Sequence, residues 1–258
     1  MELLYGLLIP FLGTFLGSLC VFLIEKEINQ NVSKALNGFA SGVMIAASIW
    51  SLLIPSINES KGMEKLSFLP PLFGFLLGIF FLLFADNVIP HLHAKSKHQE
   101  GPKCSLKPTT MMIIAITLEN IPEGMAVGIV FAGFLSGSTT ITAMGALVLS
   151  IGIAIENFPE GAIVSLSLKN EGESTTRAFL GSTLSGLAEP IATGITIILS
   201  SFAIHLFPYL LSFASGAMLY VVIEELVPEM SEGKHSNIGI VFFALGFSLM
   251  MALNITIG

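Results

Sequence analysis

The sequence has few charged residues for its length. Asp, Glu, Lys and Arg make up 11% of its 258 residues, whereas a soluble globular domain carries about 25%. Hydrophobic residues account for 53% of the chain, and the mean hydropathy is +0.84. Because a water-facing monomer could not hide so much apolar surface, the composition excludes a soluble monomer and indicates an integral membrane protein.

The chain has only two cysteines, and it lacks an early basic segment. Cys20 lies in an apolar run and Cys104 in a polar segment, so we expect no disulfide, and cysteine usage leaves the compartment open. No basic residue precedes the first apolar run, which begins after Glu2. Since a cleaved signal peptide usually starts with a basic segment, we expect this run to be a retained helix.

Long apolar runs dominate the chain instead. About 20 such residues suffice to cross a bilayer as a helix, and these runs are too long and too uniformly apolar for barrel strands. We therefore predict an all-α integral membrane protein with a single transmembrane domain over residues 1–258. The eight expected transmembrane helices are residues 3–24, 36–57, 68–90, 109–133, 140–168, 177–203, 206–228 and 237–257, with a cytoplasmic loop at 91–107.

The basic residues are distributed unevenly between the two sets of loops. One set, after the first, third, fifth and seventh expected helices, holds Lys26, Lys34, Lys95, Lys97, Lys103, Lys107, Lys169, Arg177 and Lys234. The other set holds only Lys61 and Lys65. By the positive-inside rule the first set is cytoplasmic, so both termini are expected to be extracytoplasmic.

A hexapeptide occurs twice inside apolar runs. It reads ENIPEG at residues 119–124 and ENFPEG at residues 156–161. The two glutamates of each copy are four residues apart, so they share one helix face, which the asparagine borders. Each proline leaves a carbonyl, of Leu118 or Ile155, without its helical donor. Acids at membrane depth are costly, and the motif acids have no basic partner in the interior of any expected helix, so the motif favours a cation site.

The two copies fall near the middle of consecutive, antiparallel helices. They therefore form a local inverted repeat with a site at its interface. Two divalent cations would neutralise the four glutamates, and protonation is the other solution. Glu189, which precedes Pro190 in the sixth expected helix, is a further candidate. Glycines four residues apart, at 13/17, 38/42, 74/78 and 124/128, indicate tightly packed helices.

Two sets of polar residues each allow two interpretations. Glu224, Glu225 and Glu229 either end a helix at the interface or belong to the ion route. His91, His93 and His98 are either a solvated polar loop or a metal-binding exit or sensing site. His235 is uninformative by itself.

At the doubled motif the chain resembles the ZIP family of divalent metal transporters, and most of all its GufA-like branch. The resemblance extends over nearly the whole chain. It includes the eight-helix plan, Asp86 to His93 (DNVIPHLH), the Glu-Pro at Glu189 and the run EELVPE from Glu224. It implies a ZIP-type bundle, elevator-like alternating access, uptake into the cytoplasm and a site that is often binuclear.

The resemblance also implies a ligand set. Asn120, Glu123, Asn157 and Glu160 would bind metal. Glu123 and Glu160 would bridge two ions, and Glu189 would complete the ligand shell of the second ion. Helices 1, 4, 5 and 6 would carry the site, and helices 2, 3, 7 and 8 would act as scaffold. The complete set of expected metal ligands is Glu119, Asn120, Glu123, Glu156, Asn157, Glu160 and Glu189.

Two positions depart from the family pattern. The first motif usually opens with histidine and the second often with glutamine or histidine, but here these places are Glu119 and Glu156. Imidazole suits zinc, whereas oxygen ligands suit harder ions. We therefore expect transported Zn²⁺ with a shift toward Mn²⁺ or Fe²⁺, and Cd²⁺ is a further candidate.

Three functional hypotheses are consistent with these residues. A divalent metal transporter, not an enzyme, is the leading hypothesis. An intramembrane metalloenzyme is disfavoured because no H-E-x-x-H pattern occurs, and a monovalent cation/proton exchanger would need fewer acids. We expect metal ions and a lipid bilayer as partners, no nucleic acid, and a multi-pass location in a cell membrane, a bacterial inner membrane above all. The sequence leaves a homodimer open.

Overall fold

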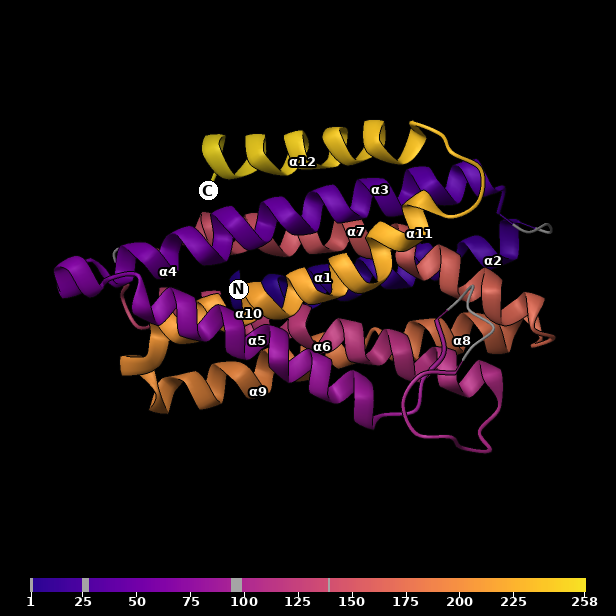
Figure 1. The fold of residues 1–258 in the computed structure, drawn as a ribbon, viewed down its shortest axis with the longest axis horizontal. Coiled ribbons are helices and arrows are strands. Elements are labelled where there is room, and N and C mark those ends of the chain that lie inside the picture. The colour runs from indigo at the N-terminus through magenta and orange to yellow at the C-terminus, as the bar shows by residue number, and fades with distance from the viewer. Residues whose placement is uncertain (1, 25–27, 94–98, 139) are drawn as a thin grey trace.

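The computed structural model describes the chain except residues 1, 25–27, 94–98 and 139 (Figure 1). For residues 2, 201 and 204 it describes the backbone only. Lys26, Lys95, Lys97 and His98 lie outside the described residues. In the described chain the only β-pairing is an isolated bridge between His91 and Glu100, and no strand forms.

Within the described residues, eight helical stretches are long and apolar enough to cross a membrane. They are Leu3–Leu23, Gln30–Glu59, Leu69–Val88, Pro108–Leu135, Ala143–Asn170, Thr175–Ser200, Phe207–Ser231 and Ile238–Thr256. The predictions of an all-α architecture with eight spans and of a multi-pass membrane protein are thereby confirmed. The side on which the termini lie stays a prediction.

Several stretches are divided into shorter elements. The helices are α1 (Glu2–Ser18), α2 (Cys20–Leu23), α3 (Gln30–Ala47), α4 (Ile54–Glu59), α5 (Leu69–Val88), α6 (Pro108–Leu135), α7 (Ala143–Asn170), α8 (Thr175–Ser185), α9 (Ala188–Phe202), α10 (Phe207–Val221), α11 (Val227–Ser231) and α12 (Ile238–Thr256). Two π-helical turns are η1 (Ser48–Leu53) and η4 (Val222–Leu226), and two 3₁₀ turns are η2 (Lys61–Leu66) and η3 (Ile204–Leu206).

Most span boundaries shift by a few residues, and two differences from the sequence prediction change its interpretation. The second span begins at Gln30, not residue 36, because Asn29 caps it by accepting a hydrogen bond from the Asn31 amide. Lys34 is therefore a buried helical residue and not a loop residue; its ammonium donates to the Lys234 carbonyl at 2.5 Å. The sixth span is not one helix, because it breaks between Ser185 and Ala188.

The helices pack as two groups. The site group contains α1, α6, α7, α8 and α9, with α1 packed on α7 and α6 packed on α9. The support group contains α3, α5, α10 and α12, with α12 packed on α3 and α5 on α10. Figure 1 shows α12 lying along α3 at one edge. The groups meet where α7 packs on α3 and α6 on α10.

The four glycine pairs lie at the closest helix contacts. A Cβ on Gly13 or Gly17 would lie within 2.2 Å of backbone in α7, and one on Gly74 or Gly78 would lie within 2.3 Å of atoms in α10. Gly38 and Gly42 face α12, and Gly124 and Gly128 face α9, in the same way. Each pair therefore joins one helix to its principal partner, as small residues do in lipid.

We expect Gly42→Val to destabilise the support group. Its Cβ would lie 2.2 Å from the Phe243 carbonyl oxygen, which is backbone and cannot move aside cheaply. Overpacking of this kind costs about 1–3 kcal/mol. A thermal melt of the purified protein in detergent should show a lower midpoint than wild type. Gly194→Ala is the control, because a Cβ there meets nothing within 4 Å; equal midpoints for the two variants would contradict the packing argument.

Candidate metal centre

The two motif copies lie on adjacent, unbroken helices. Pro122 is inside α6 and Pro159 is inside α7, and both helices continue through their prolines. Because each helix keeps its register, the residues four apart in each copy stay on one face. Among the predicted ligands on these helices, five are buried and Glu160 is half-buried.

A third element brings Glu189 to the same place. The break after α8 lets α9 begin at Ala188, so Glu189 lies in the first turn of α9 and is only 1% exposed. Its backbone oxygen would lie 2.3 Å from a Cβ on Gly124, and the Thr193 hydroxyl donates to the Gly124 carbonyl at 2.9 Å. The chain therefore approaches α6 closely enough to bring Glu189 against the motif only because residue 124 is glycine.

The carboxylates of this centre are mutual electrostatic neighbours. Glu123 interacts with Glu189 and Glu119, and Glu156 interacts with Glu123, Glu160 and Glu189. The Asn157 side chain faces both Glu123 and Glu189. Three separate helices thus bring acidic side chains to one buried region, where like charges repel unless something of opposite charge separates them.

Most polar atoms of the centre have no protein partner. Both side-chain polar atoms of Asn120, Glu156, Asn157 and Glu160, together with Oε2 of Glu123 and of Glu189, are buried without a hydrogen bond. No ion pair between described residues includes any of the seven predicted ligands. Buried polar atoms are normally satisfied, so a cluster of unsatisfied oxygens in an apolar bundle fits a bound cation.

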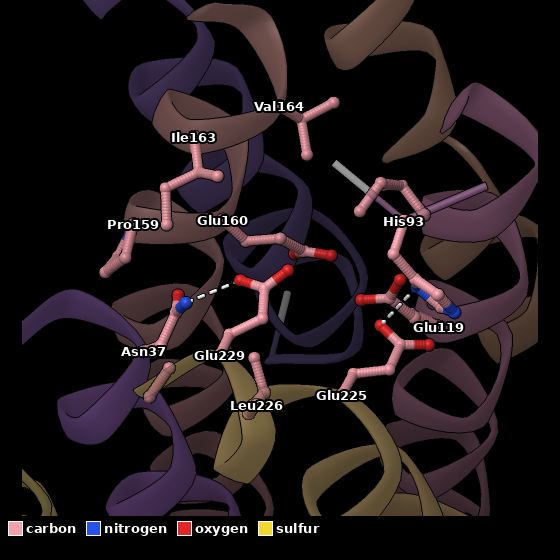
Figure 2. Close-up of a pocket in the computed structure, with 12 residues that line it drawn as sticks. Asn37, His93, Glu119, Pro159, Glu160, Ile163, Val164, Glu225, Leu226 and Glu229 are labelled. Atoms are coloured by element: carbon pink, nitrogen blue, oxygen red, sulfur yellow. Dashed lines mark hydrogen bonds and ion pairs between the residues drawn. The ribbon is translucent and has the colours of Figure 1, made fainter. Parts of the chain in front are cut away.

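Glu119 lies on the side of the centre that faces the support group. It shares a pocket with Glu160, Glu225, Glu229, Asn37 and His93 (Figure 2). In this view the Glu160 and Glu229 carboxylates face each other, while Glu119, Glu225 and His93 are grouped beside them. The Glu119 and Glu225 carboxyl groups are close enough to share a hydrogen bond, and Asn37 donates to Glu229 at 2.6 Å.

A second pocket continues from the first toward the segment that joins α5 to α6. It is lined by His93, Glu100, Glu224, Glu225, Pro228, Glu229 and Glu232. His93, Glu225 and Glu229 line both pockets, so acidic side chains lead from the buried centre to this end of the bundle, which we call the loop end. Of the two readings left open for Glu224, Glu225 and Glu229, the position of Glu225 and Glu229 favours the ion route.

Histidines at the loop end belong to an acidic cluster. One ligand atom each from Asp86, His91, His93 and Glu100 lie within 4.8 Å of one another, as do those from His93, Glu224 and Glu225. His93 Nδ1 lies 3.2 Å from Glu225 Oε2. Sequence reasoning gave Glu100 no role and named Asp86 only within a motif. His235 lies elsewhere, with Gln30 and Lys234 in a separate surface hollow.

His91 fixes the joining segment to the bundle. Its Nδ1 lies 2.7 Å from the Ile89 carbonyl, and its Nε2 lies 2.9 Å from Asp86, which also accepts from the Tyr220 hydroxyl at 3.1 Å. Burial lowers the pKa of His91, but the hydrogen bond to Asp86, the bond to Ile89 and the Asp86 charge together raise this pKa above its ordinary value.

Comparison with known proteins gives consistent matches. A family model described as ZIP Zinc transporter matches residues 103–254. The chain is 31% identical over 332 aligned positions to human "Zinc transporter ZIP11", with 96% of each chain covered. It is 31% identical over 249 positions to "Zinc transporter GufA" of Myxococcus xanthus, with 95% of each covered. It is 33% identical over 251 positions to "Zinc transporter ZIPB" of Bordetella bronchiseptica, covering 96% of this chain and 79% of that one.

Proposed function

The chain belongs to the ZIP zinc transporter family, in its GufA-like branch, and we propose that it moves divalent metal ions, Zn²⁺ among them, across a membrane. The predicted family resemblance is confirmed, and the chain is a transporter and not an enzyme. The observation that carries the proposal is the set of unsatisfied, buried oxygens on α6, α7 and α9. Without a cation this group of carboxylates is expensive to bury in an apolar bundle.

The proposed ligands are Glu119, Asn120, Glu123, Glu156, Asn157, Glu160 and Glu189. We place Glu123 and Glu160 at the centre as bridging carboxylates of a binuclear site. Their interaction with each other, and that of Glu123 with Glu189, supports this arrangement. Two divalent ions would balance most of the negative charge that the ionised carboxylates bring.

The division into two helix groups supports an elevator-like movement. All predicted ligands lie on the site group, which could carry bound ions past the support group as one body. The pockets from Glu119 to Glu100 would then release the ions at the loop end, where His93 and Glu225 receive them. The excess of Lys and Arg on the loops at this end favours a cytoplasmic location, so the direction is uptake.

The proposal also includes the membrane location of the chain and the range of ions that it carries. Residues 1–258 form a single transmembrane domain, with extracytoplasmic termini, in a bacterial inner membrane, and a second copy of the chain is a candidate partner. The carboxylate-rich ligand set favours Mn²⁺ or Fe²⁺ beside Zn²⁺, and Cd²⁺ is a further cargo.

Flux measurements test transport directly. Purified protein in liposomes that contain a metal-sensitive dye should give saturable uptake of Zn²⁺, Mn²⁺ or Fe²⁺, and protein-free liposomes give the background. A parallel assay with Na⁺ or K⁺ gradients and a pH dye tests the monovalent exchanger. Monovalent exchange without flux of any divalent ion would overturn the proposed function.

A further inference from the structure

The first transmembrane helix reaches the proposed metal centre through one hydroxyl. Thr14 lies on α1 and is completely buried, and its Oγ1 donates to Oε1 of Glu189 at 3.1 Å. The other oxygen of this carboxylate, Oε2, is buried without a hydrogen-bond partner. The two oxygens of Glu189 therefore differ: Oε1 accepts a hydrogen bond from α1, and Oε2 has no hydrogen-bond partner.

Packing holds Thr14 firmly in this position. Its carbonyl oxygen accepts from the Ser18 hydroxyl at 2.7 Å and would lie 2.4 Å from a Cβ on Gly161 of α7. A Cβ on Gly186, at the break between α8 and α9, would lie 3.0 Å from the Thr14 Cβ. Thr14 thus sits where α1, α7 and the broken sixth span meet. A β-branched side chain has little rotamer freedom in such a place.

We propose that Thr14 is a positioning residue of the metal centre, whose hydroxyl holds one oxygen of Glu189 so that the other is directed at the cation. This inference rests on the proposed role of Glu189 as a ligand. A carboxylate in the first turn of a helix that starts at a break can rotate, and the Thr14 hydrogen bond fixes one orientation before the ion arrives. Hydrogen bonds that orient ligating carboxylates are commonly worth 10–100-fold in metal affinity.

Substitutions of Thr14 separate the hydroxyl from the shape. Thr14→Val keeps the volume and removes the donor, whereas Thr14→Ser keeps the donor. We expect Thr14→Val to raise the KM for Zn²⁺ uptake in liposomes by about 10–100-fold and to reduce the Zn²⁺-induced rise in melting temperature in detergent. Thr14→Ser should remain close to wild type in both measurements.

Ser18→Ala is the matched control on the same helix. Ser18 is also completely buried, and its Oγ lies 2.7 Å from the Thr14 carbonyl oxygen and 2.8 Å from Ser182 Oγ, so its hydrogen bonds go to these two residues and not to Glu189. We expect this variant to lower the melting temperature without metal and to leave the KM unchanged. A Thr14→Val variant that behaves in the same way would show a purely structural role and overturn the proposal.

The Glu189→Gln variant distinguishes a failure of the inference about Thr14 from a failure of the proposed ligand role of Glu189. If Glu189→Gln weakens Zn²⁺ binding and Thr14→Val does not, the ligand role of Glu189 stands and the inference about Thr14 fails. If Glu189→Gln binds Zn²⁺ like wild type, both fail. If Thr14 acts through Glu189, adding Thr14→Val to Glu189→Gln changes the KM no further, and an additional tenfold loss would contradict the proposal. Should Thr14→Val not fold, Thr14→Ala is expected to give the same loss of affinity.

Discussion

Replacing Glu123 or Glu160 by alanine is expected to abolish divalent metal flux while the protein still inserts and folds. These two acids lie at the centre of the buried cluster, since Glu123 neighbours Glu119 and Glu189 while Glu160 neighbours Glu123 and Glu119. If both bridge two ions, as we propose, loss of either removes ligands from both ions at once.

Folding should survive these changes, because the cluster destabilises the empty protein. Each acid removed relieves repulsion among buried carboxylates and removes unsatisfied oxygens. We therefore expect the metal-free variants to melt at or above the wild-type temperature, while the temperature rise on adding Zn²⁺ disappears. Glu123→Gln and Glu160→Gln, which keep the shape, should lose flux as the alanine variants do.

An exposed acid provides the control for this experiment. Glu171, which follows α7, is exposed to solvent and lies outside both pockets, so Glu171→Ala should transport like wild type. Retained flux in Glu123→Ala or Glu160→Ala would mean that the ion passes elsewhere and that the site is misplaced. A fall in melting temperature for the variants alone would indicate that these acids stabilise the fold in a way the unsatisfied oxygens do not suggest.

The spans and the ligand-bearing helices could be predicted because each depends on local sequence. An apolar run of sufficient length must be helical in lipid, and residues four apart must share a helix face. The clustering of motif acids from α6 and α7 follows from these two rules and from the consecutive order of the helices. Glycine pairs four residues apart likewise identified the faces of close contact, although not the partners they would meet.

The two π-helical turns of the described chain are related to the positions of prolines in the sequence, which the apolar runs alone do not reveal. Both π-helical turns precede a proline, Pro55 after η1 and Pro228 after η4. Because proline lacks an amide hydrogen, the bonding pattern shifts one residue before it: the Ile54 amide donates to the Ile49 carbonyl and the Val227 amide to that of Val222. The second shift occurs within the run that contains Glu224 and Glu225, and Glu225 lines both pockets.

Contacts between distant segments could not be read from the sequence. The hydrogen bond between Thr14 and Glu189 joins residues 175 positions apart, and a threonine in an apolar helix has many ordinary roles. The approach of His93 to Glu225 likewise depends on how the segment between α5 and α6 folds back over the bundle. The doubled motif identified where to look, and tertiary packing determines which further side chains reach it.

The position of His93 bears on the choice of metal. The family resemblance implies histidine at position 119 and glutamine or histidine at position 156, but both are glutamate here, so the proposed ligands are only carboxylates and amides. His93 lines the pocket that Glu119 and Glu160 also line, and it interacts with Glu119. The chain therefore keeps an imidazole at the loop end of the route, outside the buried centre. Selection of the metal ion in the buried centre would then depend on carboxylate and amide groups, whereas binding of the ion at the loop end would also involve the His93 imidazole.

Glu119→His is accordingly expected to raise the preference for Zn²⁺ over Mn²⁺. Imidazole nitrogen strengthens zinc binding far more than manganese binding, and the substitution also removes a negative charge that favours harder ions. We expect the ratio of kcat/KM values for Zn²⁺ and Mn²⁺ in liposomes to rise on the order of tenfold, which corresponds to about 1.4 kcal/mol. Glu119→Gln removes the charge without adding a nitrogen ligand, so it should reduce uptake of both ions and leave their ratio nearly unchanged. An unchanged ratio in Glu119→His would show that the ion never contacts position 119, and that selectivity resides in the remaining carboxylates or at His93.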